Sequence, residues 1–239
     1  MAAFVLVHGA WHGAWCWSRV LPALRAAGHG AHAVTLTGVG ERAHLLSRDI
    51  TLRTHVADVV NLIACEELDG VVLVGHSYGG LVVTGAADRL LAARAPTLRH
   101  LVYIDAVVPH PGESWSSHHG AELVARRLAD AAAHPQGALP PPDAALYGLS
   151  GSDAAWVNRR QTPHPFGMYR EPLSFDAARL AAVPRTFIDC TDPAWPSIAP
   201  MRDRVRSEPG WRVRELATGH DAMVGAPGPL TRLLLEAVA

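Results

Sequence analysis

The chain has 239 residues, of which 18% are charged, and its 21 basic and 22 acidic side chains give a formal net charge of −1. All 21 basic residues are arginines, which excludes Schiff-base enzymes and the phosphate-binding lysines of ATPases and kinases. The near-neutral charge, with arginines scattered among acidic residues, gives no electrostatic footprint for DNA, RNA or an anionic membrane surface.

Short apolar runs bounded by glycine or polar turns alternate with segments of helical periodicity. Most of these runs are rich in β-branched residues, as strands are, and the predicted strands are 4–7, 31–36, 71–74, 101–104, 186–190 and 212–216. The predicted helices run from Ser18 to Gly28, 51–68, 79–94 and 230–238. This alternation predicts an α/β fold with a mostly parallel, doubly wound sheet of about six strands.

The alternation stops between residues 107 and 183, where prolines cluster and aromatic residues are interspersed. A loop of that length without structure of its own is uncommon in a compact domain. We therefore expect residues 107–183 to form an inserted, partly helical lid over one end of the sheet. The core would then consist of residues 1–106 and 184–239, as one domain that carries an insertion.

Residues 75–79 read GHSYG, and they follow the buried strand 71–74 and precede a helix. A Gly-x-Ser-x-Gly motif in that setting predicts a nucleophile elbow, a sharp strand-to-helix turn that holds a serine hydroxyl at the strand tip. The helix N-terminus behind the serine offers N–H groups and a favourable field for a developing oxyanion. The motif alone would also fit an ordinary glycine turn. Because both flanking elements are present, we predict that Ser77 is a catalytic nucleophile.

A serine nucleophile requires a base, and the base requires an acid that orients it. Behind an elbow of this kind the chain order is serine, acid, histidine. His220 is the predicted base, because it follows the last predicted strand in a turn that would reach back over the strand tips. Asp192 and Asp105 each follow a predicted strand, at the carboxyl ends where sites on parallel sheets form. We expect Asp192 to be the acid, with Asp105 as the alternative.

The loop after the first strand is expected to complete an oxyanion hole. The predicted donors are the backbone N–H groups of Ala10 and Tyr78. Trp11 and His12, in the same loop, are expected either to line the acyl side of the pocket or simply to pack. The other candidate substrate-binding residues are Trp115, Trp156, Phe166, Met168, Tyr169 and Trp195. Packing within the lid would explain each of these equally well, and a largely apolar substrate is the modest consequence.

Cysteine usage and the N-terminus bear on the compartment. Cys16, Cys65 and Cys190 lie far apart and form no Cys-x-x-Cys pair, so neither a disulfide framework nor a zinc cluster is predicted. The N-terminal apolar run is too short for a signal peptide, and no run approaches the roughly 18 apolar residues of a membrane span. We expect a cytoplasmic protein whose partner is a small-molecule ester, with no nucleic-acid or membrane partner. A homodimer is one candidate assembly.

These motifs together resemble the α/β-hydrolase family, in particular its small plant methylesterases, hydroxynitrile lyases and related bacterial carboxylesterases. The resemblance covers nearly the whole chain and is carried by the stretches HGAWHGAW at 8–15, GHSYGG at 75–80 and GHD at 219–221. The stretches TLTGVGERAH at 35–44 and CTDP at 190–193 are similar to bacterial carboxylesterases, some of which are pyrethroid hydrolases. The resemblance implies a triad of Ser77, His220 and Asp192, with neither a metal nor an organic cofactor.

Ester hydrolysis through an acyl-enzyme is the expected reaction. The hydroxynitrile lyases of this branch carry a lysine directly after the catalytic histidine, whereas this chain has Asp221 there and no lysine to replace it. Cyanohydrin cleavage is therefore disfavoured. The alternative is a non-hydrolytic use of the fold, as a C–C lyase, a cyclase or a ligand-binding protein in a natural-product pathway, because fold does not fix function.

Overall fold

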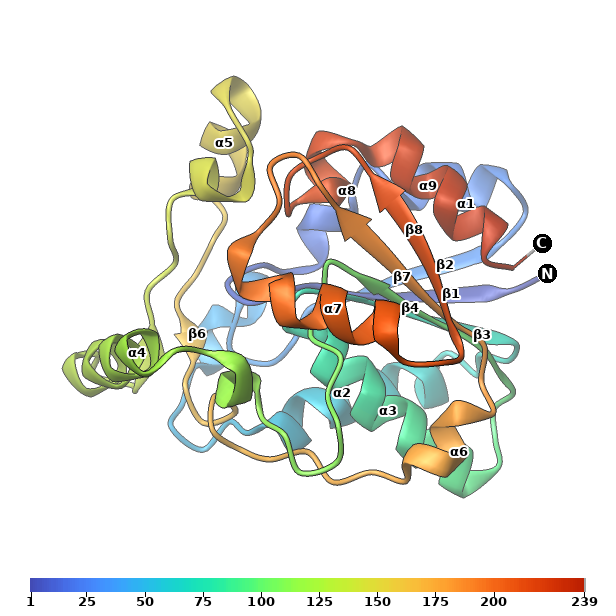
Figure 1. Cartoon of the computed structure of the whole chain (residues 1–239), viewed down its shortest axis with the longest axis horizontal. Helices are drawn as coiled ribbons and strands as arrows, with labels where there is room; N and C mark the ends of the chain where they lie inside the picture. Colours follow the sequence, from blue (N-terminus) through green and yellow to red (C-terminus); the bar gives the residue numbers. More distant parts are fainter. Residues whose placement is uncertain (239) are drawn as a thin grey trace.

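A six-stranded parallel sheet forms the centre of the computed structural model, which describes residues 1–238 (Figure 1). The strand order is β2-β1-β3-β4-β7-β8, and every neighbouring pair is parallel. The strands are β1 Ala3–Val7, β2 Gly30–Val34, β3 Val71–His76, β4 Leu98–Ile104, β7 Arg185–Cys190 and β8 Trp211–Leu216. The six predicted strands and the mostly parallel α/β architecture are confirmed. Because β2 and β3 lie on opposite sides of β1, the chain changes winding direction there, and sites on such sheets form at this point.

Helices cover both faces of the sheet. The helices that connect or follow its strands are α1 Leu21–Ala26, α2 Leu52–Cys65, α3 Gly79–Ala93, α7 Ala199–Ser207, α8 Ala222–Gly225 and α9 Pro227–Glu236. In Figure 1, α1 and α9 lie on one side and α2 and α3 on the other. None of the helices in the described part of the chain combines enough length with enough apolar character to cross a bilayer.

Two helix starts differ from the sequence prediction. The first helix begins at Leu21, because a 3₁₀ helix over Ala14–Trp17 occupies the preceding loop and Ser18 ends that turn instead of capping α1. The last helix begins earlier than predicted, at Pro227, where a proline suits the first helical position. The start of α2 is as predicted, since Thr51 caps it through a reciprocal capping box with Thr54.

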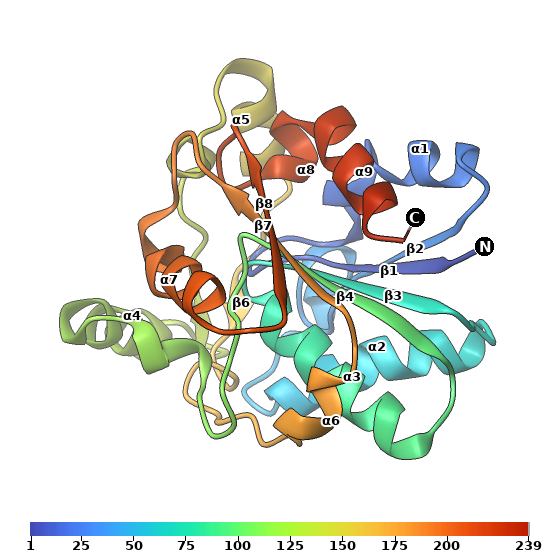
Figure 2. The ribbon, with the colours of Figure 1, turned by 45° about the vertical axis from the view of Figure 1, so that its right-hand side comes forward.

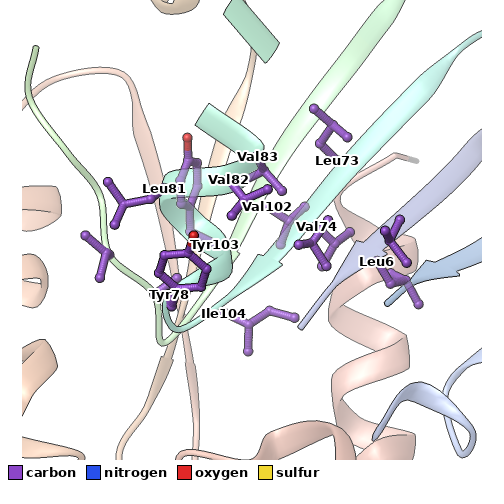
Figure 3. Packing of buried hydrophobic residues seen from close by; sticks show 14 of the residues in the cluster. Leu6, Leu73, Val74, Tyr78, Leu81, Val82, Val83, Val102, Tyr103 and Ile104 are labelled. Atoms are coloured by element: carbon purple, nitrogen blue, oxygen red, sulfur yellow. The ribbon is translucent and has the colours of Figure 1, made fainter. Parts of the chain in front are cut away.

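The central strands are buried on both faces, which explains their uninterrupted apolar sequences. Side chains of β1, β3 and β4 pack together with those of α3, as Figure 3 shows for Leu6, Leu73, Val74, Val82, Val83, Val102 and Ile104, all of them fully buried. Burying a side chain of this size contributes about 1.5–3 kcal/mol. The carboxyl ends of β3 and β4, which hold the candidate site, are therefore anchored in the buried centre of the sheet.

The segment between β4 and β7 contains three helices and a small antiparallel ribbon. These are α4 Ala121–Ala133, α5 Gly151–Asn158, α6 Ala177–Ala181, β5 Ala138–Leu139 and β6 His164–Pro165. Figures 1 and 2 show α4, α5 and β6 beyond the carboxyl ends of the strands. In contrast, α6 lies beside α3 although it falls within residues 107–183. The cover over the strand ends thus comes from the part of this segment that precedes α6.

Candidate active site

Ser77 occupies the turn between β3 and α3, as the sequence motif predicts. Its backbone is left-handed, with φ of 53°, and its side chain is partly exposed at the tip of β3. The Ser77 carbonyl accepts hydrogen bonds from the amides of Gly80, at 3.1 Å, and Val107, at 3.0 Å. The residue is therefore held in a sparsely populated conformation by the start of α3 and by the segment after β4.

Two glycines make this tight turn sterically feasible. A Cβ atom on Gly79 would lie 2.8 Å from the carbonyl oxygens of Val7 and His8, at the end of β1. A Cβ atom on Gly80 would lie 2.0 Å from the carbonyl oxygen of Val107. Only a residue without a side chain allows these backbones to approach so closely. The glycines thus let the end of β1 and the segment after β4 pack directly against the serine turn.

His220 forms a short hydrogen bond to Asp105. The distance between His220 Nδ1 and Asp105 Oδ2 is 2.6 Å, and the Asp105 side chain is fully buried. Because a carboxylate can only accept, Nδ1 carries the proton, which leaves Nε2 as the free acceptor of the neutral ring. The side chains of His220 and Ser77 line the same cavity. The two predicted residues therefore share one cavity, and His220 is held there by its Nδ1 contact with Asp105.

The structure corrects the expected position of the acid, because Asp105 and not Asp192 lies against His220. Asp192 is exposed in the turn after β7, where its amide donates to the Thr218 carbonyl at 3.0 Å. Asp105 directly follows β4, which is the neighbour of β3 in the sheet. Its backbone is left-handed, with φ of 41°. Asp192 follows β7, which is separated from β3 and its serine turn by β4. The pairing that both the sequence preference and the family resemblance favoured is therefore wrong in this structure.

Arg202 of α7 binds the other oxygen of Asp105. Its Nη2 donates to Asp105 Oδ1 at 2.6 Å, and its Nε donates to Asp189 Oδ1 at 2.5 Å. Nη1 donates to the Trp195 carbonyl at 2.8 Å. Both oxygens of Asp105 thus have charged or ring N–H partners, which fixes the plane of its carboxylate. No sequence motif marks Arg202, and its role could only be found from the fold.

The amides of Ala10 and Tyr78 remain available for an oxyanion. Neither N–H donates a hydrogen bond to any residue within 1–238. Trp11, the residue after Ala10 in the same loop, has a left-handed backbone with φ of 65°. Ser77 and Asp105 share this conformation, so three of the five non-glycine residues with positive φ in the described chain lie at the site. Strained backbone of this kind concentrates at functional sites.

A second histidine–aspartate pair lies behind the oxyanion loop. His12 Nε2 is 2.9 Å from Asp221 Oδ2, and His12 Nδ1 is 2.8 Å from the Ala10 carbonyl. Because both ring nitrogens face acceptors, the ring is a doubly protonated imidazolium. Burial alone would lower the pKa of His12, but its attraction to Asp221 outweighs burial and raises it. Burial alone would likewise raise the pKa of Asp221, but the attraction of His12 lowers it. The two residues form a buried ion pair.

Other buried histidines at the site are neutral. His8 donates from Nδ1 to the Gly9 carbonyl at 2.7 Å and accepts from the Leu36 amide at 3.1 Å, and burial lowers its pKa to about 3. His8 thus bonds only backbone groups. His76 donates from Nε2 to the His220 carbonyl at 3.0 Å, and burial together with the nearby His220 ring holds its pKa well below 6.5. His76 thus supports the turn that carries His220.

A narrow cavity of about 50 Å³ opens onto Ser77 and His220. Its lining is mostly aromatic or aliphatic and consists of Trp11, Ser77, Val107, Trp115, His118, His119, Leu123, Arg127, Tyr147, Trp195, Ser197, Ile198, Met201 and His220. Of the predicted substrate-binding residues, Trp11, Trp115 and Trp195 line it. Trp195 also stacks on the His220 ring, with 5.1 Å between the ring centroids. Sequence reasoning missed Tyr147 and Arg127, because nothing in their local sequence separates cavity lining from lid packing.

The other predicted substrate-binding residues lie elsewhere. His12 is buried in its ion pair with Asp221. Trp156 packs edge-on against Trp15, with 5.0 Å between the ring centroids. The three remaining residues pack inside the cover and do not line the cavity: Phe166, Met168 and Tyr169. In residues 1–238 no three His, Cys, Asp or Glu side chains are grouped to hold a metal ion.

Comparison with known proteins gives the class to which this fold and site belong. Residues 4–232 match the alpha/beta hydrolase family. A carbendazim hydrolyzing esterase from Nocardioides sp. strain SG-4G is 42% identical over 245 residues, covering 98% of each chain. An extracellular alpha/beta-hydrolase from a Paenibacillus species superposes with a TM-score of 0.85 at 22% identity, over 100% of this chain and 99% of its own. The methylesterase MES16 from Arabidopsis superposes with a TM-score of 0.76 at 25% identity, over 100% of this chain and 99% of its own.

The chain therefore belongs to the alpha/beta hydrolase family. Within that family it is an enzyme of the carboxylic ester hydrolase class, as are the esterases to which it is similar. The resemblance inferred from the sequence motifs, including the likeness to plant methylesterases and to a pyrethroid hydrolase, is confirmed.

Proposed function

We propose that the chain is a serine esterase in which Ser77 is the nucleophile, His220 the general base and Asp105 the orienting acid. The observation that carries this proposal is the 2.6 Å contact between His220 Nδ1 and buried Asp105, on a histidine that shares one cavity with Ser77. The same three roles, in any chain order, define a serine hydrolase. Asp105 takes the place that the sequence resemblance had given to Asp192.

In the first half-reaction, Ser77 Oγ attacks the ester carbonyl while His220 Nε2 accepts the hydroxyl proton. Asp105 keeps the proton on Nδ1 and stabilises the imidazolium that forms. The Ala10 and Tyr78 amides donate to the tetrahedral oxyanion, assisted by the N-terminus of α3. His220 then returns its proton to the leaving alcohol, which leaves Ser77 acylated.

In the second half-reaction, water attacks the acyl-enzyme by the same route. His220 accepts a proton from water, the oxyanion forms again on the two amides, and Ser77 leaves with the proton that His220 returns. Every proton transfer therefore passes through one imidazole nitrogen. The His12–Asp221 ion pair supports the loop that holds Ala10, because His12 binds the Ala10 carbonyl at 2.8 Å.

The substrate that we propose is a small ester with a flat, largely apolar body. Trp11, Trp115 and Trp195 line the cavity that opens onto Ser77, and aromatic walls of this kind favour apolar or aromatic groups. The names of similar proteins, a carbendazim hydrolyzing esterase and plant methylesterases, support an ester with a small alcohol group. The cytoplasmic location and the homodimer stay predictions.

Hydrolysis of p-nitrophenyl acetate and butanoate by the wild type and by Ser77→Ala tests the proposal. We expect Ser77→Ala to lose at least about 10³-fold in kcat, and a fluorophosphonate to label Ser77 in the wild type, as shown by peptide mass spectrometry. Ser207→Ala, an exposed serine at the end of α7, is the matched control and should keep wild-type turnover. Equal turnover by wild type and Ser77→Ala, with no label on Ser77, would overturn the proposal and favour non-hydrolytic use of the site.

A further inference from the structure

Arg127 is a cation in the wall of the catalytic cavity. It belongs to α4 of the cover, and its guanidinium lies over the Trp11 ring, 4.9 Å from the ring centroid. Trp11 directly follows Ala10, whose amide is a proposed oxyanion donor. The side chain of Trp11 is itself fixed, because its Nε1 donates to the Leu139 carbonyl at 3.0 Å. The cation therefore shares the cavity of Ser77 and packs against the loop that contributes Ala10.

The guanidinium has no anionic partner in the protein. Among residues 1–238, Arg127 forms neither an ion pair within 4.0 Å nor a side-chain hydrogen bond. Its neighbours are Asp130, one helical turn along α4, the exposed Arg126, and the phenols of Tyr147 and Tyr169. Burial lowers the pKa of Arg127, which means that its charge is poorly compensated.

The histidines around Arg127 do not provide an anionic partner for it, directly or through a free carboxylate. His119 donates or accepts at the Tyr169 hydroxyl, 2.8 Å away, and burial lowers the pKa of His119 to about 4. His164 is fully buried, and burial keeps its pKa well below 6.5. His118 is engaged with Glu113 at 3.1 Å, so this carboxylate is already partnered. The residues that line the cavity with Arg127 therefore include no carboxylate.

A partly buried arginine with unused N–H donors is a natural receptor for a carboxylate, because its planar fork matches the two oxygens. From its position in the cavity of the proposed serine esterase, on which this inference rests, we propose that Arg127 binds an anionic group of the substrate. The preferred substrates are then hemiesters, flat or extended esters that carry a carboxylate away from the ester bond. The reaction is the same hydrolysis, and Arg127 contributes binding only.

Two matched pairs of esters test this proposal. In the first pair, monomethyl adipate has a carboxylate where methyl hexanoate has its terminal methyl group, so the charge lies on the acyl side. In the second, 4-carboxyphenyl butanoate and 4-methylphenyl butanoate place the same contrast on the alcohol side. The measured quantity is the ratio of kcat/KM for the charged ester to kcat/KM for its neutral partner.

We expect Arg127→Met to lower this ratio by about 10- to 100-fold in at least one pair, as for the loss of a charge-assisted hydrogen bond. Arg127→Lys keeps the charge and should fall between the wild type and Arg127→Met. Arg126→Met, which removes the neighbouring exposed arginine outside the cavity, should keep the wild-type ratio. In the wild type, the ratio should also decrease as NaCl is raised, because salt screens the contact between charges.

A ratio that is the same in the wild type and Arg127→Met for both pairs would overturn the proposal. So would a wild-type ratio that does not change with salt, and this measurement does not depend on the stability of any variant. Arg127 would then act only as packing for the cover over Trp11. Failure of the serine esterase proposal is separate, since it would show as retained turnover in Ser77→Ala.

Discussion

Asp105 Oδ2 lies 2.6 Å from His220 Nδ1, across 115 residues of sequence, in a side chain with no exposed surface. Its other oxygen binds Arg202 at 2.6 Å. The carboxylate thus lies between the proposed catalytic base and the partly buried guanidinium of Arg202. This arrangement leaves Asp105 no freedom to turn away from His220.

Exchanging each aspartate for asparagine separates the two candidate acids. Asp105→Asn should lower kcat by about 10³- to 10⁴-fold, because an amide can hold His220 in the wrong tautomer and cannot stabilise the imidazolium. Asp192→Asn should stay within about threefold of the wild type, because Asp192 is exposed and away from His220. Initial rates with p-nitrophenyl butanoate give both values. A larger loss in Asp192→Asn would restore the assignment that the sequence favoured.

Arg202 is expected to act as a positioning residue for Asp105. Arg202→Met should lower kcat by about 10- to 100-fold with little change in KM, since a small displacement of the acid tilts the base. Arg202→Lys should recover part of the loss. Steady-state kinetics with a neutral ester, together with melting temperatures, distinguish this effect from simple destabilisation.

Arg206 provides the matched control for Arg202. It binds Asp189 Oδ2 at 2.6 Å and Glu215 at 2.9 Å but does not contact Asp105. Arg206→Met should therefore lower stability while kcat stays near the wild-type value. If both variants lose kcat equally, the effect of Arg202 is structural, through Asp189, and not through Asp105.

Asp221→Asn should destabilise the protein by about 3–5 kcal/mol, because it leaves the buried His12 imidazolium without its anion. The pH dependence has a defined sign. The raised pKa of His12 gives stability that is present below pH 6.5 and lost as pH rises through the folded-state value. The lowered pKa of Asp221 gives stability that is present above pH 3.8 and lost as pH falls.

The stability difference between wild type and Asp221→Asn should therefore be largest between about pH 4 and 6.5. Urea unfolding of both proteins from pH 5 to pH 9 measures it. The double variant His12→Gln/Asp221→Asn should lose less than the sum of the two single variants, since neither charge is left alone. A difference that grows above pH 8 would contradict the ion-pair assignment.

Lowering the pH should begin to destabilise the protein near pH 6.5, well above the range in which carboxylates titrate, because several buried histidines stay neutral in the folded protein. Burial lowers the pKa of His8 to about 3 and of His55 to about 4, and holds those of His76 and His164 well below 6.5. Groups of this kind give stability that is present above pH 6.5 and lost as pH falls, because the unfolded chain binds the protons first. Each contributes a slope of about 1.4 kcal/mol per pH unit.

Unfolding free energies measured between pH 7 and pH 5 give the slope directly. His55→Gln removes one titrating group, and the amide can still donate to the Thr37 carbonyl that His55 binds at 2.9 Å. The slope of its unfolding free energy against pH should be smaller than the wild-type slope by about 1.4 kcal/mol per pH unit, the contribution of one proton. An unchanged slope would mean that His55 is already charged in the folded protein.

The sheet and the serine turn could be predicted because their signals are local. Each strand is a short apolar run, and the two close approaches at Gly79 and Gly80 need glycine whatever the rest of the chain does. His220 could also be placed, because it follows the last strand at the edge where all six carboxyl ends meet. These features depend on neighbours in sequence or on chain order alone.

The acid could not be chosen in the same way. Asp105 and Asp192 have equivalent positions in the sequence, each after a strand at the carboxyl edge. The structure separates them, since Asp105 is buried against His220 whereas Asp192 is exposed. Arg202, which holds Asp105 from α7, has no sequence signal either. Packing over long distances decides such contacts.

The aromatic residues of the cover show the same limit. Trp115 lines the cavity and Trp156 does not, although both are tryptophans in the same inserted segment. In the sequence, Asp221 is distinguished only by occupying the position of the lysine found in hydroxynitrile lyases. The structure gives it a partner of its own, His12, which lies 209 residues earlier in the chain.

Residues 220 and 221 are adjacent, yet His220 reaches Asp105 while Asp221 reaches His12. The length of the turn between β8 and α8 is therefore locked, because inserting or deleting one residue would break both contacts at once. Gly219, in the same turn, has no room for a side chain, because a Cβ atom there would lie 2.2 Å from the Tyr147 carbonyl oxygen. Relatives with this pair of contacts should thus keep the number of residues in the turn unchanged.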